Sequence, residues 1–279
     1  AKRNWHNFFN VVLFAGLITA FYGLFQFFGW AETHQGASRI DASLGNSAYM
    51  AVFMIMNAFI SAFMAISVYN PSKKIPAISY YILALFFSFI MFQTGTRGTI
   101  LGWLSAIIIS CFIYAVFGKK NKGQSNISRI ISGGIIAIII ILGIAFYFNR
   151  DAKWIRKNEV LGRLASISIS DTKTQARGYI WPMAIKGIFE SPKRAIIGIG
   201  QENFNYIFNA NYNPEMWKHE QWFDRAHSVF LDWLVAGGIL GLLSYLSLYI
   251  ISLMYIIKSD ITIGQKSAFI GLLIGYGIH

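Results

Sequence analysis

An arginine with several threonines and glycines lies between two apolar stretches, in the segment Gln93-Thr94-Gly95-Thr96-Arg97-Gly98-Thr99. The glycines allow a tight turn in which backbone can approach a ligand closely. The planar guanidinium of Arg97 matches phosphate oxygens through two parallel hydrogen bonds. We therefore predict a phosphate-binding turn. The alternative is a simple interface arginine, with its stem in lipid and its charge in water.

A histidine suited to proton transfer lies in the segment Phe223-Asp224-Arg225-Ala226-His227-Ser228. We expect a helix that is capped by Asp224 and runs through His227 as far as Leu234. The positive end of the helix dipole disfavours imidazolium, so the ring is expected to be neutral at neutral pH. Asp224 lies three residues earlier on the same helix face and would orient the ring of a general base. A plain surface histidine is the alternative.

Three further arginines, Arg39, Arg163 and Arg177, are candidates for binding the same anionic ligand as Arg97. Taken singly, each is better explained as a solvated or lipid-facing charge. We assign them, with Asp224, to substrate binding, and His227 and Arg97 to the reaction itself.

Known cofactor and metal motifs are missing from the sequence. Gly198-Ile199-Gly200 is not a dinucleotide fingerprint, because Asn203 stands where the third glycine belongs. We interpret it as a turn that leads into Phe204. The sequence contains no Asp-x-Asp, no His-Glu-x-x-His and no Cys/His cluster. It therefore predicts neither a metal site nor a cofactor.

The composition places these residues in a membrane protein. Hydrophobic residues make up 55% of the chain and charged residues 13%, whereas a soluble domain carries roughly a quarter charged residues. The formal charge of +12 comes from basic residues that flank apolar runs, which fits membrane topology and anionic lipid better than nucleic acid. The single Cys111 excludes a disulfide framework.

Apolar runs of the length needed to cross a bilayer recur along the chain. They cover about 8–29, 47–69, 76–93, 99–117, 130–148, 238–257 and 267–279. The first run is too long for a signal peptide and has no cleavage site after it. The last is cut short, so we expect seven spans, six of them complete, in a piece of a longer protein.

The expected fold is an all-α, polytopic transmembrane helical bundle with one large external loop. We divide the chain into a five-span bundle over 1–148, an extracytoplasmic loop with short amphipathic helices over 149–237, and two further spans over 238–279. Within the loop we expect an amphipathic helix over Trp181–Glu190, with Pro182 in its first turn, resting on the membrane surface. Its residues Trp181, Ile185, Ile188 and Phe189 would face lipid or the bundle.

Further loop features follow from turn residues. We expect Ser191-Pro192 to end the amphipathic helix. The stretch from Asn209 to Asn213, with Pro214 after it, is expected to be irregular. Gly237-Gly238 marks a joint before the sixth span.

The charges in the short loops predict the orientation. One side receives Lys2, Arg3, Lys73, Lys74, Lys119, Lys120, Lys122, Arg129, Lys258 and Lys266. The other side's short loops receive Arg39 and Arg97 alone. Basic loops stay in the cytoplasm, so Arg39, Arg97 and the 149–237 loop are expected outside.

The combined pattern resembles the O-antigen ligase and polymerase superfamily of bacterial membrane glycosyltransferases. Four stretches between 39 and 257 carry the resemblance. They are Leu44-Gly45-Asn46-Ser47-Ala48; Thr94-Gly95-Thr96-Arg97-Gly98; Arg177-Gly178-Tyr179-Ile180-Trp181 with Ile197-Gly198-Ile199-Gly200 and Asn203-Phe204; and Ala226-His227-Ser228 with Asp232-Trp233-Leu234 and Gly237-Gly238-Ile239-Leu240-Gly241. The chain departs from the family in having fewer spans, as an excised piece would.

The resemblance implies transfer of a glycan from a polyprenyl-diphosphate carrier to an acceptor hydroxyl, outside the bacterial cytoplasmic (inner) membrane. The acceptor would be a glycolipid, a glycan or a protein. Cations that stabilise the diphosphate leaving group can replace a metal and a general acid. His227 would then be the base, and direct displacement would make the enzyme an inverting, metal-independent glycosyltransferase.

Two other classes of protein stay open from the sequence. A transporter or flippase for lipid-linked or anionic solutes would be expected to carry charges within its spans or broken helices in two repeats, and neither pattern is visible. A non-catalytic scaffold would tolerate changes at His227 and Arg97. Within the family, the sequence does not separate a ligase from a polymerase or a protein O-oligosaccharyltransferase.

Overall fold

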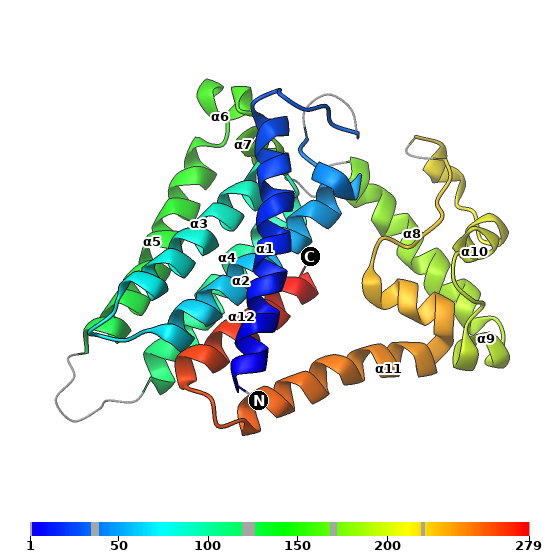
Figure 1. The fold of residues 1–279 in the computed structure, drawn as a ribbon. Helices are drawn as coiled ribbons and strands as arrows, with labels where there is room; N and C mark the ends of the chain where they lie inside the picture. The colour runs from blue at the N-terminus through cyan, green and yellow to red at the C-terminus, as the bar shows by residue number, and fades with distance from the viewer. Residues whose placement is uncertain (1, 35–38, 119–125, 168–171, 219–220, 279) are drawn as a thin grey trace. The chain divides into compact units, whose positions relative to one another are not determined.

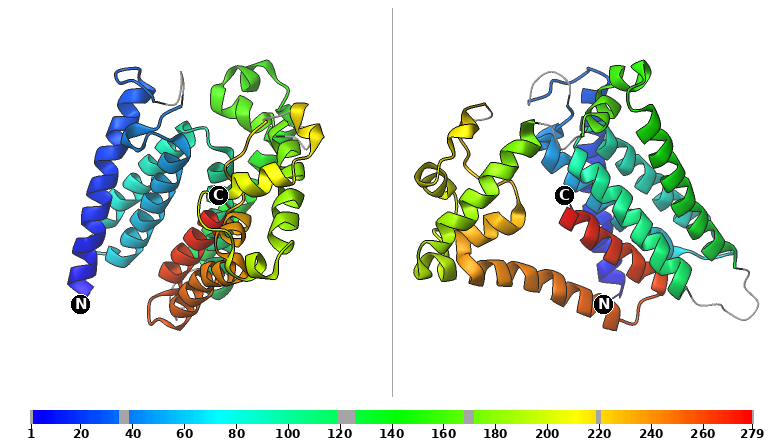
Figure 2. Two further views of the ribbon diagram at one scale, coloured as in Figure 1. Left: turned by 90° about the vertical axis from the view of Figure 1, so that its right-hand side faces the viewer. Right: turned by 180° about the vertical axis from the view of Figure 1, so that it is seen from behind.

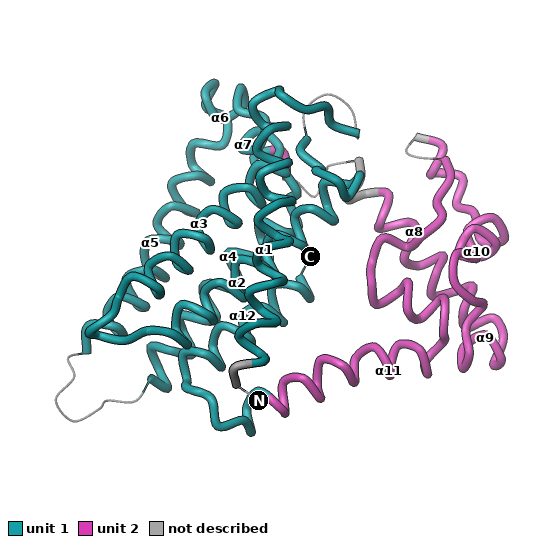
Figure 3. Tube along the Cα trace, viewed as in Figure 1, with its two compact units in different colours: residues 1–165, 256–279 teal, residues 166–255 magenta. Residues whose placement is uncertain are grey.

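The computed structural model describes residues 2–34, 39–118, 126–167, 172–218 and 221–278, and these residues form α-helices and short 3-10 helices without a β-strand (Figure 1). The all-α fold class is thus confirmed. Lys119, Lys120 and Lys122, which were used to predict orientation, lie outside the described residues. The chain divides into two compact units, residues 1–165 with 256–279 (unit 1) and residues 166–255 (unit 2), which are coloured separately in Figure 3.

Among the described residues, six helices are long and apolar enough to cross a membrane, which agrees with the six complete spans expected from the sequence. They are α1 (Lys2–Phe27), α2 (Ser47–Val68), α3 (Ile75–Gln93), α4 (Arg97–Phe117), α5 (Ile127–Asn149) and α11 (Val229–Lys258). A seventh apolar helix, α12 (Ile263–Ile278), has 16 residues. The protein is therefore a multi-pass membrane protein.

Helices α4 and α12 of unit 1 pack closely against each other and lie side by side in Figures 1 and 2. A Cβ atom added to Gly102 of α4 would lie 2.5 Å from the carbonyl oxygen of Gly275, and one added to Gly271 would lie 2.0 Å from Oγ of Ser110. Ser110 also donates a hydrogen bond of 2.8 Å to the carbonyl of Ser267. Small residues let helix backbones approach in this way in a membrane, where dispersion and hydrogen bonds drive helix association.

The two ends of unit 1 carry the loop residues that the sequence assigned to opposite sides. At one end lie η1 (Ala42–Leu44), α6 (Lys153–Lys157) and α7 (Glu159–Ala165), together with the connection from α3 to α4. At the other end Gln265, before Lys266, bonds Oγ of Ser67 over 2.7 Å, close to the loop that holds Lys73. Arg39 and Arg97 therefore lie at the opposite end of unit 1 from Lys73 and Lys266, as expected. That the arginine end faces the outside of the cell stays a prediction.

Unit 2 contains α8 (Thr172–Phe189), α9 (Pro192–Ile197), α10 (Phe204–Ala210), η2 (Pro214–Lys218) and the first part of α11. Its core is apolar and includes the wholly buried Ile180, Ile188 and Phe208. The helix expected over Trp181–Glu190 is longer than predicted and begins at Thr172, so Pro182 lies inside it rather than in its first turn. The prediction failed because polar residues before Trp181 masked the start of the helix.

Other expectations for unit 2 are confirmed in part. The helix ends before Ser191-Pro192, as expected, and these two residues also start α9, with Ser191 in the N-cap position and Pro192 as the first residue. Asn209 belongs to α10 rather than to an irregular stretch. On α8, Ile188 packs into the core of unit 2, while Trp181, Ile185 and Phe189 are exposed at 41%, 46% and 55%. These three are four residues apart and share one helix face. The apolar surface stripe is real, but Ile188 is not part of it.

Candidate active site

The connection between α3 and α4, residues Thr94–Arg97, is a tight turn that we call the arginine turn. Gly95 lies in the left-handed region with φ of 62°, a conformation that glycine adopts without strain. Thr94 is wholly buried, and its hydroxyl donates to the carbonyl of Met91 over 2.7 Å. Arg97 follows at once as the first residue of α4. The turn thereby puts Arg97 at the positive end of a helix of 21 residues, a place that favours anions.

Two arginines that are far from the arginine turn in the sequence form hydrogen bonds with it. Arg39 donates from Nε to the carbonyl of Thr94 over 3.0 Å and from Nη2 to Oγ1 of Thr96 over 2.9 Å. Arg163 donates from Nε to the carbonyl of Gly95 over 3.2 Å. Cations are favoured at these carbonyls because they end α3, the negative end of its dipole. Arg39 thus bonds the turn through two of its nitrogens, and Arg163 bonds it through Nε.

The arginine turn is consequently a concentration of positive charge. Burial, and then repulsion from Arg163, lower the pKa of the Arg39 guanidinium, while the carboxylate of Glu159 acts in the opposite direction. Arg39, Arg163 and Arg97 were predicted as anion-binding residues, and the structure brings the guanidiniums of Arg39 and Arg163 to the turn that holds Arg97. Arginines so placed suit a ligand with two phosphates.

A buried carboxylate that sequence reasoning missed holds the loop carrying Arg39. Asp41 is wholly buried; its Oδ1 accepts from Nε2 of Gln26 over 2.8 Å, and its Oδ2 accepts from the backbone N–H of His34 over 2.9 Å. In return, Oε1 of Gln26 accepts from the backbone N–H groups of Asp41 and Ala42 over 3.0 and 2.8 Å. The only hint in the sequence was an acidic residue between apolar Ile40 and Ala42, two positions after Arg39.

Replacing Asp41 by asparagine should destabilise the protein at neutral pH and much less in acid. Burial alone would raise the pKa of Asp41, but the hydrogen bonds from Gln26 and His34 outweigh it and leave the pKa below its usual value. A lowered pKa contributes stability above the carboxyl's ordinary pKa of about 4, and that contribution is lost as pH falls through the lowered value. The melting temperature of Asp41→Asn should therefore lie below that of the wild type at pH 7, corresponding to roughly 1–3 kcal/mol.

The difference in melting temperature should shrink below pH 4 and become small at the most acidic pH that the protein tolerates. Ser43→Ala, a change at an exposed position two residues later in η1, serves as the control and should follow the wild type at every pH. A difference in melting temperature between Asp41→Asn and the wild type that stays constant across the pH range would rule out a stabilising role for the ionised carboxylate of Asp41.

His227 lies in the segment Phe223–Ser228, which we call the histidine segment. Contrary to our expectation, no helix starts at Asp224; α11 begins at Val229, and His227 precedes it with φ of 52°. That conformation is incompatible with a helix. The imidazole is exposed, and the buried ring of Phe223 meets it edge to face at 5.4 Å between centroids. The histidine is thus accessible and held near the start of a helix, although not within it.

The carboxylate that organises the histidine segment is Asp232 rather than Asp224. Oδ1 of Asp232 accepts from the backbone N–H of Ala226 over 2.8 Å, and Asp232 lies within electrostatic range of His227. Nε1 of Trp181 donates to the carbonyl of the same Ala226 over 3.1 Å. Both backbone groups before His227 are therefore bonded, which explains how its left-handed conformation is maintained. An acidic residue in the first turn of a helix was the signal available in the sequence.

The other two residues predicted to bind substrate, Asp224 and Arg177, lie at the surface of unit 2. Asp224, Arg225 and Asp232 line a cavity of about 110 Å³ in unit 2. Asp224 is exposed, and so is Arg177 on α8. Arg97 belongs to unit 1 and His227 to unit 2, so their convergence on one cavity stays a prediction. Within the described ranges, no three His, Cys, Asp or Glu side chains gather closely enough to hold a metal ion.

The Gly198-Ile199-Gly200 segment has a structural role in positioning the histidine segment. The N–H groups of Ile199 and Gly200 bond the carbonyls of Val235 and Ala236 over 2.9 and 3.0 Å. This contact holds the first part of α11 just before its kink at Gly238, where the sequence predicted a joint. The segment thus forms the turn that we expected and also bonds the backbone of α11. We call this contact the backbone crossing.

Comparison with known proteins identifies the family. The sequence model described as O-antigen ligase matches residues 82–246, which include the arginine turn, Arg163, Arg177 and the histidine segment. The chain belongs to the O-antigen ligase family. No curated protein matches it, and no solved structure does. The O-antigen ligase family comprises membrane glycosyltransferases, so the lipid-linked glycan and the acceptor implied by the resemblance apply at family level.

Proposed function

We propose that this member of the O-antigen ligase family transfers a glycan from a polyprenyl-diphosphate carrier to an acceptor hydroxyl at the outer face of the bacterial inner membrane. The observation that carries the proposal is the arginine turn. The guanidiniums of Arg39 and Arg163 bond this turn, and Arg97 is its last residue, at the end of the bundle opposite the lysine-bearing loops. By the positive-inside rule that end faces outward, which is where the donor's diphosphate lies.

The arginine turn would bind the diphosphate and stabilise the charge that it gains as it leaves. When the bond between the anomeric carbon and the phosphate oxygen breaks, the electron pair stays with the diphosphate. Fixed cations stabilise that charge without reorganising, which is the usual source of the largest catalytic gain. The reaction proposed here therefore needs neither a metal ion nor a protonated leaving group.

His227 would be the general base. Its exposed imidazole would accept the proton of the acceptor hydroxyl as that oxygen bonds to the anomeric carbon from the face opposite the diphosphate. A single displacement of this kind inverts the anomeric centre. Arg177 and Asp224, both exposed in unit 2, are proposed to contact the substrates. The stripe of Trp181, Ile185 and Phe189 suits a helix that rests on lipid.

The test of this function is transfer by the full-length protein in lipid nanodiscs, with lipid-linked glycan from the native membrane and the cell's own acceptor fraction. We expect transfer to continue in EDTA. Arg97→Lys should reduce the rate by about 10- to 100-fold, because a point charge cannot make the paired hydrogen bonds of a guanidinium.

Arg194→Lys makes the same chemical change on the surface of α9, where Arg194 pairs with Glu190 over 3.5 Å. It should leave the rate within twofold of the wild type, as exposed ion pairs contribute little. Loss of transfer in EDTA, or equal rates for Arg97→Lys and Arg194→Lys, would contradict the proposed chemistry.

A further inference from the structure

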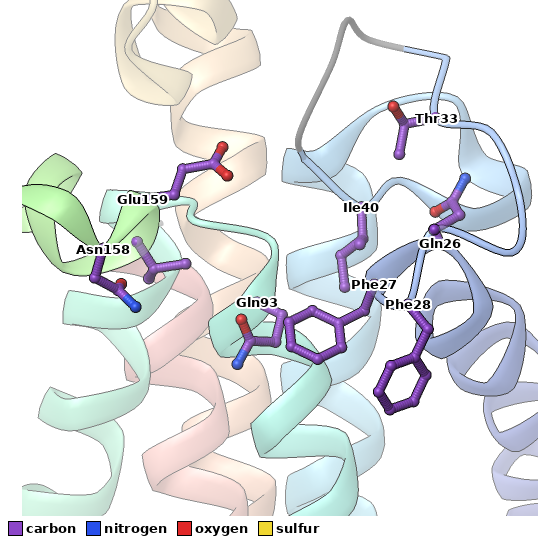
Figure 4. A pocket seen from close by; sticks show the side chains of 10 residues that line it. Gln26, Phe27, Phe28, Thr33, Ile40, Gln93, Asn158 and Glu159 are labelled. Atoms are coloured by element: carbon purple, nitrogen blue, oxygen red, sulfur yellow. The ribbon is translucent and has the colours of Figure 1, made fainter.

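A second cavity, of about 480 Å³, lies next to the arginine turn (Figure 4). Its walls come from the end of α1, the loop that follows it, the last residue of α3 and the junction of α6 and α7, all within unit 1. Ile40 and Val160 in the lining are neighbours in sequence of Arg39 and Glu159, and Glu159 interacts electrostatically with Arg39. The volume is in the range of small-ligand sites.

The cavity presents hydrogen-bonding groups of both kinds beside an aromatic ring. In Figure 4, Gln93 lies next to Phe27 at the centre of the view, with Asn158 and Glu159 to one side. The amide of Gln93 offers both a donor and an acceptor. Oδ1 of Asn158 caps α7 by accepting from the N–H of Leu161 over 2.9 Å, so its Nδ2 is the part that remains to donate. Glu159 adds an acceptor.

The charges and hydrogen-bonding groups of the cavity indicate which class of ligand it can bind. The carboxylate of Glu159 disfavours an anion inside the cavity, and Arg39 and Arg163 beside it disfavour a cation. A purely apolar ligand would cover the half-buried amide of Gln93 and the exposed amide of Asn158 without replacing their hydrogen bonds to water, which is costly. A neutral molecule rich in hydroxyl groups satisfies donors and acceptors together, and its C–H face can lie against Phe27. A sugar ring has these properties.

We propose that this cavity is a subsite for the sugar next to the diphosphate of the donor. The inference rests on the proposed function, since the arginine turn would hold the diphosphate beside the cavity. Specificity for the first sugar would then lie in unit 1, in residues Gln93, Asn158 and Glu159, apart from the base in unit 2. The bare polyprenyl diphosphate would use the arginine turn alone.

The experiment compares two ligands on the full-length protein in nanodiscs: lipid-linked glycan from the native membrane, and polyprenyl diphosphate without sugar. Gln93→Leu keeps the approximate size of the side chain and removes its hydrogen bonds. We expect its Kd for the glycan-linked lipid to rise about tenfold, the effect of one or two lost hydrogen bonds, and its Kd for the bare carrier to change less than twofold. Gln221→Leu, the same change at an exposed position of unit 2, should alter neither.

Glu159→Gln is a second variant that keeps the shape of the side chain. It should also weaken binding of the glycan-linked lipid, while binding of the bare carrier should stay the same or tighten, because a negative charge beside Arg39 has been removed. Equal changes in Kd for both lipids in both variants, or no change in either, would overturn the sugar subsite and leave the proposed function intact. If the wild-type protein bound neither lipid, both proposals would fall.

Discussion

The His227→Ala protein should transfer glycan about 10² to 10⁴ times more slowly than the wild type, the usual contribution of a general base. The ring is exposed and lies outside any helix. The contacts that shape the segment are made by its neighbours, through the backbone of Ala226 with Asp232 and Trp181. Removing the imidazole therefore takes away the proton acceptor and one edge-to-face contact with Phe223. The measurement is the single-turnover rate with saturating donor.

Two controls separate a missing base from a damaged fold. The melting temperature of His227→Ala should match the wild type within a few degrees, and the Kd for lipid-linked glycan should be unchanged because the diphosphate binds elsewhere. Added imidazole should restore part of the rate, since the position is open to solvent. Wild-type activity in His227→Ala would remove this residue from the mechanism while leaving the arginine turn untouched.

The second large effect is expected at the backbone crossing in unit 2. Gly238 has φ of 64° and ψ of −160°, and Gly198 has φ of 70° and ψ of −161°, a region that only glycine adopts readily. A Cβ at Gly238 would lie 2.4 Å from the carbonyl carbon of Ile196, and one at Gly198 would lie 2.4 Å from the carbonyl oxygen of Ala236. Because both obstacles are backbone atoms, no side-chain movement relieves the overlap.

Gly238→Ala should consequently destabilise the protein by more than about 3 kcal/mol, combining strained backbone with steric overlap. We expect its melting temperature in detergent to fall by about 10 °C, and transfer to be lost because the start of α11 positions the histidine segment. The matched control is Gly237→Ala. A Cβ on Gly237 meets no atom within 4 Å, so this neighbour should be as stable as the wild type or slightly more so. Identical melting curves for the two variants would contradict the close backbone contact between Gly238 and the segment Ile196–Gly198.

The loop end of unit 1 shows how far residue types could predict the site. Arg97 and its turn were identified because glycines and threonines surround the arginine between two apolar runs, a composition that favours a tight polar turn at the membrane boundary. The partners of the turn could not be found this way. Arg39 and Arg163 lie 55 and 68 positions from the carbonyls that they bond, and no local pattern specifies such a pairing. Asp41 was overlooked because its partner Gln26 lies 15 residues earlier, in the preceding span.

The sequence by itself determined the spans, their number and the sorting of basic residues to opposite ends, because about 20 consecutive apolar residues have one stable conformation in a bilayer, the helix. It also indicated the family. The tertiary structure decided where helices outside the spans begin, since those starts depend on capping contacts such as Asp232 with Ala226. It also decided that Gly198 packs against α11 and that Ile188 is core rather than surface. Each of these depends on contacts between residues that are far apart in the sequence, and the local periodicity of a chain does not specify such contacts.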